Sequence, residues 1–139
     1  ELGFSGSRFL MGRSLGAHPA LELAANGGSR FRGLILESGA GSIREMLGRL
    51  GLLDTEVGGQ LAANHEAKIR SIVMPALLIH GERDQLVPLR TAEELHKLLE
   101  ATSRHLVVIA GAGHNDILWV GRTQYFEAIR DFVARSKTL

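Results

Sequence analysis

Four short apolar runs, separated by segments with helical character, constrain the fold of this chain more than any other feature. The runs occupy residues 9–11, 33–37, 76–80 and 106–109. Nearly continuous apolar runs of this length are typical of strands that are covered on both faces of a parallel sheet. Strands that alternate with helices predict right-handed crossovers between parallel neighbours. We therefore expect an α/β fold with a parallel sheet of about four strands and flanking helices.

The segments between the runs predict helices at residues 15–26, 43–53, 88–101 and 122–136. In the second of these helices the apolar face comprises Ile43, Met46, Leu47 and Leu50; in the last it comprises Phe126, Ile129 and Val133. Residues 54–64 are polar, contain glycine and show no strand pattern. This middle segment is either a small lid over a site or a crossover connection, and we favour the crossover.

Gly12-Arg13-Ser14-Leu15-Gly16 follows the first apolar run and fits the G-x-S-x-G pattern of a nucleophile elbow. In such an elbow the serine lies at a strained turn between a strand and a helix, so that its hydroxyl is accessible. We expect Gly12 and Gly16 to be required, because a Cβ at either position would clash in so tight a turn. The alternative is that Ser14 only caps the following helix.

Two further loops carry residues suited to nucleophilic catalysis. Asp84 follows the third run in Gly81-Glu82-Arg83-Asp84-Gln85, and His114 follows the fourth in Gly111-Ala112-Gly113-His114-Asn115-Asp116. Because the carboxyl ends of parallel strands meet at one edge of a sheet, Ser14, Asp84 and His114 are expected there together. Glu82 and Asp116 are rival acids, and an ordinary loop histidine is the alternative for His114.

The order serine, aspartate, histidine on these three loops resembles the α/β-hydrolase family. The match covers nearly the whole chain and is most similar to the serine hydrolase branch that includes Bem46-like proteins and relatives of acyl-protein thioesterases. The resemblance implies that Ser14 attacks an acyl carbonyl, that His114 accepts its proton, and that Asp84 orients the imidazole. It also implies that the backbone N–H of Leu15 contributes to the oxyanion hole.

The resemblance begins at the elbow strand, whereas in the family four strands usually precede that strand. We therefore interpret residues 1–139 as a single partial α/β-hydrolase domain, the C-terminal half of the fold with its N-terminal half absent. The loop that normally supplies the second oxyanion N–H is absent with it. Two functions follow as hypotheses: a serine hydrolase of esters or thioesters, and a non-catalytic fragment that serves as an assembly or binding module.

Composition restricts the partners. The net charge is +1, with 16 basic and 15 acidic residues, so no electrostatic field recruits nucleic acid or an acidic membrane surface. There is no cysteine, which excludes disulfides and thiolate metal sites. We expect a small-molecule ester or thioester substrate and no cofactor, metal, nucleic-acid or membrane partner. No signal peptide or membrane-spanning run is visible, and we expect a cytoplasmic protein.

The strand at residues 7–11, from Ser7 to Met11, is central in the complete family fold. Without its neighbour it becomes an exposed edge, and such an edge is a template for pairing with another chain. We therefore expect a two-fold homodimer that pairs this strand with its own copy in an antiparallel manner. Additional strands from a missing N-terminal half are the alternative cover for the same edge.

Overall fold

Four parallel strands form one sheet, and they lie side by side in their order along the chain. The computed structural model describes residues 6–39 and 43–136. The strands are β1 (Phe9–Arg13), β2 (Gly33–Glu37), β3 (Ala76–Gly81) and β4 (Arg104–Ile109). All four strands predicted from the apolar runs are confirmed, and they extend at most two residues beyond the expected limits.

The helices connect the strands and cover both faces of the sheet. They are α1 (Ala17–Gly27), α2 (Arg44–Arg49), α3 (Glu56–Arg70), α4 (Leu89–Leu98), α5 (Ile117–Val120) and α6 (Arg122–Ser136), with 3-10 turns η1 (Ser14–Gly16) and η2 (Gly28–Arg30). In the described part of the chain, no helix has the length and apolar character that crossing a membrane requires.

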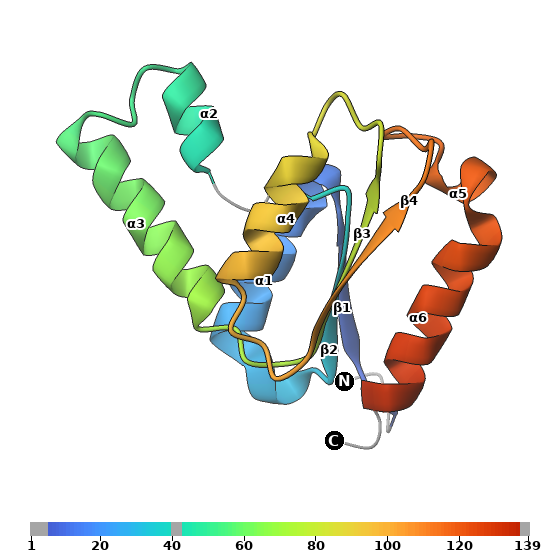
Figure 1. Cartoon of the computed structure of the whole chain (residues 1–139). Helices are drawn as coiled ribbons and strands as arrows, with labels where there is room; N and C mark the ends of the chain where they lie inside the picture. The colour runs from blue at the N-terminus through green and yellow to red at the C-terminus, as the bar shows by residue number, and fades with distance from the viewer. Residues whose placement is uncertain (1–5, 40–42, 137–139) are drawn as a thin grey trace.

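Two apolar layers hold the sheet between helices. Helices α1, α3 and α4 lie on one face, and α6 lies on the other (Figure 1). Alternate residues of β2 point into the two layers: Leu34 and Leu36 pack on the side of α1, and Ile35 packs on the side of α6. This alternation explains the continuous apolar run, because both faces of the strand are buried.

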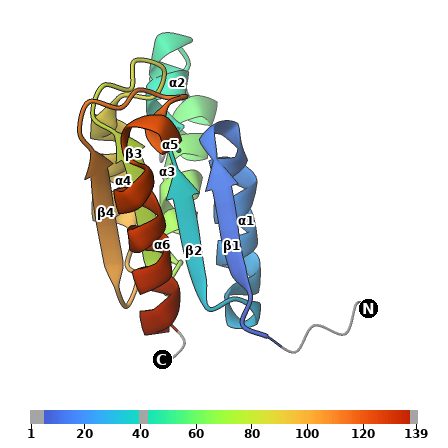
Figure 2. The same cartoon turned by 90° about the vertical axis from the view of Figure 1, so that its right-hand side faces the viewer.

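Strand β1 departs from that expectation. It is the edge strand of the sheet, its neighbour in the described residues is β2, and Figure 2 shows it at the side of the molecule. Phe9 and Leu10 are therefore half-buried, and Met11 is 51% exposed. The prediction that this run is covered on both faces was wrong, whereas the expectation of an exposed edge is confirmed, since among the described residues β1 pairs with β2 alone.

The first predicted helix begins later than expected, and the apolar faces predicted for the second and the last helix were partly wrong. Residues 14–16 form the 3-10 turn η1 rather than α-helix, and Leu15 in this turn is 83% exposed. Helix α2 is much shorter than predicted; its Leu47 is buried, but its Met46 and the following residue Leu50 are exposed. In α6, whose bounds were predicted correctly, Phe126 is exposed. The buried aromatic residues of α6 are Tyr125 and Phe132.

The polar middle segment forms helix α3, which the sequence did not predict. Thr55 caps it by accepting a hydrogen bond from Gly58 N through its side chain. Ala62 and Ile69 of the helix are buried, and Ile69 packs in the same apolar cluster as residues of α1. Because it lies between two parallel neighbouring strands, β2 and β3, the segment is the crossover connection that we favoured.

Candidate active site

Ser14 lies immediately after β1 in a strained backbone conformation. Its φ is 52°, in the left-handed region that non-glycine residues rarely adopt. A Cβ on Gly12 would lie 2.4 Å from the carbonyl oxygen of Gly16 and 2.8 Å from Cβ of Ala20, so the turn requires glycine there. A Cβ on Gly16 would have no atom within 4 Å. The expectation that both glycines are required was therefore right for Gly12 and wrong for Gly16.

The structure brings Ser14, His114 and Asp84 into direct contact. His114 Nε2 lies 2.9 Å from Ser14 Oγ, and His114 Nδ1 lies 2.7 Å from Asp84 Oδ2. A carboxylate only accepts hydrogen bonds, so Nδ1 carries the ring proton. The lone pair of Nε2 is then free to accept from the Ser14 hydroxyl. The expected proximity of the three residues is confirmed.

Asp84 is held in place by its own loop. Its Oδ1 accepts hydrogen bonds from the backbone N–H groups of Leu86 at 3.0 Å and Val87 at 2.8 Å. The side chain is completely buried, and that of His114 is 9% exposed. Because Oδ1 is occupied by these two donors, Oδ2 remains available for His114. The backbone thus fixes the direction in which the carboxylate faces.

The rival acids have other partners. Glu82 Oε2 accepts from the backbone N–H of Gly111 at 2.8 Å, and Asp116 Oδ1 accepts from that of Gly113 at 2.6 Å. Both carboxylates therefore stabilise the loop that carries His114. The close packing of the two loops also requires Gly81, because a Cβ there would lie 2.6 Å from the carbonyl oxygen of Ala112.

Sequence reasoning missed a polar cluster beside this site. Arg13 and Glu37 end the neighbouring strands β1 and β2 in register, and Arg13 Nε donates to Glu37 Oε1 at 2.9 Å. Tyr125 donates to Glu37 Oε2 at 2.8 Å. Arg13 also reaches the loop of His114. The signal in the sequence was the equal position of the two charged residues at the ends of adjacent strands.

One further histidine lies beside this contact: His80 Nε2 is 3.5 Å from Asp84 Oδ2, and both side chains are buried. The same nitrogen of His80 lies 2.7 Å from the carbonyl oxygen of Val87, to which it donates. His18 and His65 pack against each other with ring centroids 5.7 Å apart. Among residues 6–39 and 43–136, no three His, Asp or Glu side chains gather as a metal-ion site would require.

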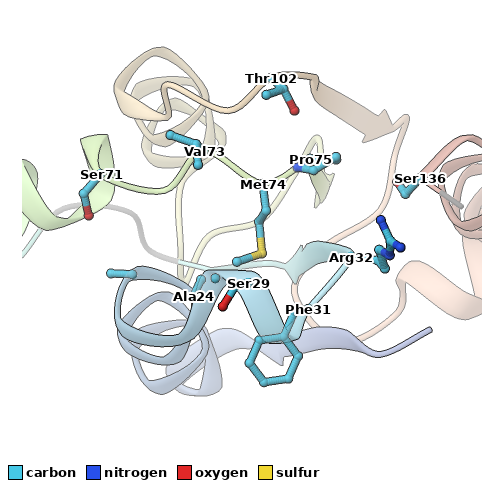
Figure 3. A pocket seen from close by; sticks show the side chains of 12 residues that line it. Ala24, Ser29, Phe31, Arg32, Ser71, Val73, Met74, Pro75, Thr102 and Ser136 are labelled. Atoms are coloured by element: carbon cyan, nitrogen blue, oxygen red, sulfur yellow. The ribbon is translucent and has the colours of Figure 1, made fainter. Parts of the chain in front are cut away.

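A hollow of about 700 Å³ lies at the amino ends of the strands, where β2, β3 and β4 begin (Figure 3). Its lining includes Arg32 before β2, Pro75 before β3 and Thr102 before β4. In parallel sheets ligands bind beyond the carboxyl ends of the strands, and Ser14 lies at the carboxyl end of β1. This hollow is therefore separate from the cluster around Ser14.

Comparison with known proteins agrees with this fold. A family model described as TAP-like protein, an α/β-hydrolase family, matches residues 55–138, which is more than half of the chain. A second match is α/β hydrolase domain-containing protein 17B of Xenopus laevis, which is 37% identical over 68 residues. This chain belongs to the α/β-hydrolase family.

Solved structures of hydrolases share the fold at low sequence identity. Est1E from Butyrivibrio proteoclasticus has a TM-score of 0.76 at 22% identity, and the match covers all of this chain and 65% of Est1E. The monoacylglycerol lipase of Paleococcus ferrophilus has a TM-score of 0.65 at 16% identity, with coverage of 92% and 69%. The likeness at these identities concerns the fold.

The chain spans only part of these relatives. The match to the Xenopus laevis protein covers 49% of this chain and 23% of that protein. About a third of each matched hydrolase structure has no counterpart in this chain. The comparisons therefore show the α/β-hydrolase fold and family, and the family model covers Asp84 and His114 and begins after Ser14.

Proposed function

We propose that this chain carries the catalytic residues of a serine hydrolase that cleaves carboxylic esters or thioesters. The observation that supports the proposal most strongly is the continuous chain of hydrogen bonds from Asp84 through His114 to Ser14. An imidazole that donates from Nδ1 to a carboxylate and accepts at Nε2 from a hydroxyl is placed to act as a general base toward that hydroxyl.

The proposed reaction proceeds through an acyl-enzyme. Ser14 Oγ attacks the carbonyl carbon while its proton passes to His114 Nε2. The imidazolium is stabilised by the ionised Asp84 and returns the proton to the leaving alcohol or thiol as the C–O or C–S bond breaks. Water then gives a proton to His114 and attacks the acyl carbon, which releases the carboxylic acid and restores Ser14.

The negative charge that develops on the carbonyl oxygen needs hydrogen-bond donors. In a helix the first N–H groups have no partner in a preceding turn, and the N–H of Leu15 is in this position at the start of η1. The family resemblance assigns a second donor to a loop that precedes the elbow strand. Loss of one such donor lowers the rate by roughly a hundredfold to a thousandfold. We therefore expect slow turnover by these 139 residues alone.

An apolar hollow beside the acid loop supports an apolar acyl group in the substrate. It has a volume of about 420 Å³. Leu86, Val87 and Pro88 line one side, and these residues follow Asp84 directly. Met46 of α2 and Leu50, which follows the helix directly, line the other side. Each methylene group that leaves water for such a surface contributes about 0.8 kcal/mol.

Labelling with a fluorophosphonate, followed by mass spectrometry, tests the proposal. The probe reacts with a serine whose proton is accepted by a nearby base, so we expect the label on Ser14. Labelling should disappear in Ser14→Ala and fall sharply in His114→Ala. Two matched controls, Ser71→Ala and His105→Ala, change exposed residues outside the site and should be labelled like the unaltered chain.

Label that persists in Ser14→Ala contradicts the assignment of the nucleophile. If the 139-residue chain takes no label but a longer chain with preceding strands does, the result favours the alternative function, a non-catalytic fragment that acts as an assembly or binding module. Whichever chain takes the label is then tested without the probe, and its rates of hydrolysis of acyl esters and acyl thioesters of increasing chain length define the substrate class.

A further inference from the structure

Arg13 connects three segments that are distant in the sequence. Its Nε donates to Glu37 Oε1 at 2.9 Å. Its Nη2 donates to the backbone carbonyl of His114 at 2.8 Å and to Asn115 Oδ1 at 2.9 Å. One planar guanidinium therefore joins the ends of β1 and β2 to the histidine loop, and this geometry uses the fixed fork of donors that arginine offers.

The anchor of Arg13 is a buried carboxylate. Glu37 is 5% exposed, and its two oxygens receive Arg13 Nε and the hydroxyl of Tyr125. A buried charge is tolerated only when it is paired and hydrogen-bonded, so the carboxylate of Glu37 requires donors such as Arg13 and Tyr125. Burial raises the pKa of Tyr125 well above its ordinary value, and its hydrogen bond to Glu37 raises it further. Tyr125 thus remains a donor to Glu37.

The histidine loop is held from two sides. On the side of the acid loop, Gly111 N donates to Glu82 and Arg83 N donates to the carbonyl of Ala112. On the side of the elbow, the described residues contribute the bonds from Arg13 and the contact between Ser14 and His114 itself. The position of the His114 backbone relative to Ser14 therefore depends on Arg13.

We infer that Arg13, anchored on Glu37, is a positioning residue that sets the distance from His114 Nε2 to Ser14 Oγ. The inference rests on the proposed function, because it concerns the geometry of the same general base. Asp84 fixes the direction of the imidazole at Nδ1, and Arg13 fixes the backbone from which the ring extends. A base must remain within hydrogen-bond reach of its proton, and a displacement of the order of 1 Å costs about a hundredfold in rate.

The test compares Arg13→Ala with Arg70→Ala, which removes a similarly exposed arginine from an ion pair with Glu100. Two quantities are measured: the rate of fluorophosphonate labelling at Ser14, and the low-field proton resonance of His114 Nδ1–H. We expect Arg13→Ala to slow labelling at least tenfold and to broaden or remove the resonance. Arg70→Ala should stay within twofold of the unaltered chain and keep the resonance.

The variant Arg13→Lys separates the effect of the planar guanidinium donors from the effect of the positive charge. Lysine carries the charge without the planar pair of donors, so we expect it to restore less than half of the lost labelling rate. A labelling rate in Arg13→Ala within threefold of the unaltered chain overturns the positioning role, and full recovery in Arg13→Lys overturns the requirement for the planar pair of donors. Thermal unfolding is followed in parallel, and Arg13→Gln, which retains an amide donor, replaces Arg13→Ala if that variant does not fold.

The two proposals fail in different ways. If Ser14 in the unaltered chain takes no label, the proposed function is contradicted, but the resonance of His114 still tests the positioning role. A resonance that is identical in Arg13→Ala and the unaltered chain overturns that role whatever the labelling shows. A labelled Ser14 combined with an unchanged rate in Arg13→Ala supports the function and rejects the role of Arg13.

Discussion

Tyr125 donates a hydrogen bond of 2.8 Å to Glu37 Oε2, and this contact joins helix α6 to the end of strand β2. Both residues are buried, and residue 125 is far from residue 37 in the chain. The hydroxyl satisfies one oxygen of a carboxylate whose other oxygen receives Arg13. The packing of α6 is thereby coupled to the polar cluster beside Ser14.

Replacement of Tyr125 by phenylalanine should destabilise the fold. The variant keeps the ring but leaves Glu37 Oε2 buried without this donor, which costs about 1–3 kcal/mol. The free energy of unfolding, measured by denaturant titration, should fall by that amount. Thr123→Ala, a change at an exposed position of the same helix, is the control and should stay within about 0.5 kcal/mol. Equal stability of Tyr125→Phe and the unaltered chain would show that solvent replaces the donor.

Asp84→Asn should reduce labelling of Ser14 by about a thousandfold to ten-thousandfold. The amide retains an oxygen for Leu86 N and Val87 N, so the loop keeps its shape. Its NH₂ group would then face His114 Nδ1 and favour the tautomer protonated at Nε2, which is unable to accept from Ser14. Nitrogen chemical shifts of the His114 ring report the tautomer directly. An unchanged tautomer with full labelling would refute the orienting role of Asp84.

The two elbow glycines should respond differently to alanine. In Gly12→Ala the new Cβ would overlap the carbonyl oxygen of Gly16. We therefore expect the free energy of unfolding to fall by about 1–3 kcal/mol or more. Gly16 has φ −65° and ψ −11°, a conformation that alanine adopts freely. Gly16→Ala should therefore stabilise the chain by about 0.4–1 kcal/mol. Denaturant titration of both variants measures the difference, and equal losses would contradict it.

The sequence was sufficient for the elements whose environment is local or periodic. The apolar run at Gly33–Glu37 predicted β2 with its observed bounds, because both faces of that strand are buried. Ser14, Asp84 and His114 were found from their positions after strands, since the topology of a parallel sheet brings those positions to one edge. Their contacts followed from the fold rather than from any long-range pattern.

Other features depend on tertiary contacts that no local pattern encodes. Helix α3 has a polar sequence, and it is stabilised by the Thr55 cap and by a few small or apolar side chains packed on the sheet layer. Met11 is exposed in the edge strand of the sheet that the described residues form. The contacts of Arg13 follow from the strand register, which places it beside Glu37, and from the histidine loop, whose His114 carbonyl accepts its hydrogen bond. Neither is encoded near Arg13 in the sequence.

The buried position of His65 leads us to expect that the free energy of unfolding decreases in mild acid. Its burial lowers its pKa below the ordinary 6.5, and the positive charges of His18 and Lys68 lower it further, against smaller opposing effects of Glu22 and Glu66. The unfolded chain therefore binds a proton at a higher pH than the folded chain does. The contribution of His65 to the free energy of unfolding is therefore complete above about pH 6.5. It decreases as the pH falls toward the pKa of His65 in the folded chain.

Denaturant titrations between about pH 5 and 8 measure this effect. His65→Gln should lose less free energy of unfolding than the unaltered chain as the pH falls through this range. His105→Gln, at an exposed position on β4, is the control and should keep the dependence of the unaltered chain. If the acid-dependent loss is the same in His65→Gln, other groups cause it.

The edge strand β1 predicts self-association. Its partner in the described residues is β2, so the other side of its backbone offers N–H and C=O groups to a further strand. The exposed side chains of Met11 and Leu15 add apolar surface at the same edge. We propose that two copies pair through β1 about a two-fold axis and form a continuous eight-stranded sheet, with a total interface above about 1,000 Å².

Light scattering at tens of micromolar should therefore give the mass of a dimer. Met11→Lys introduces a charge at the edge and should give a monomer with an unchanged circular dichroism spectrum. Val57→Lys, at an exposed apolar position on α3, is the matched control and should remain a dimer. A stable monomer of the unaltered chain contradicts the pairing. A longer chain that contains further strands before β1 should be monomeric, because those strands would occupy the same edge.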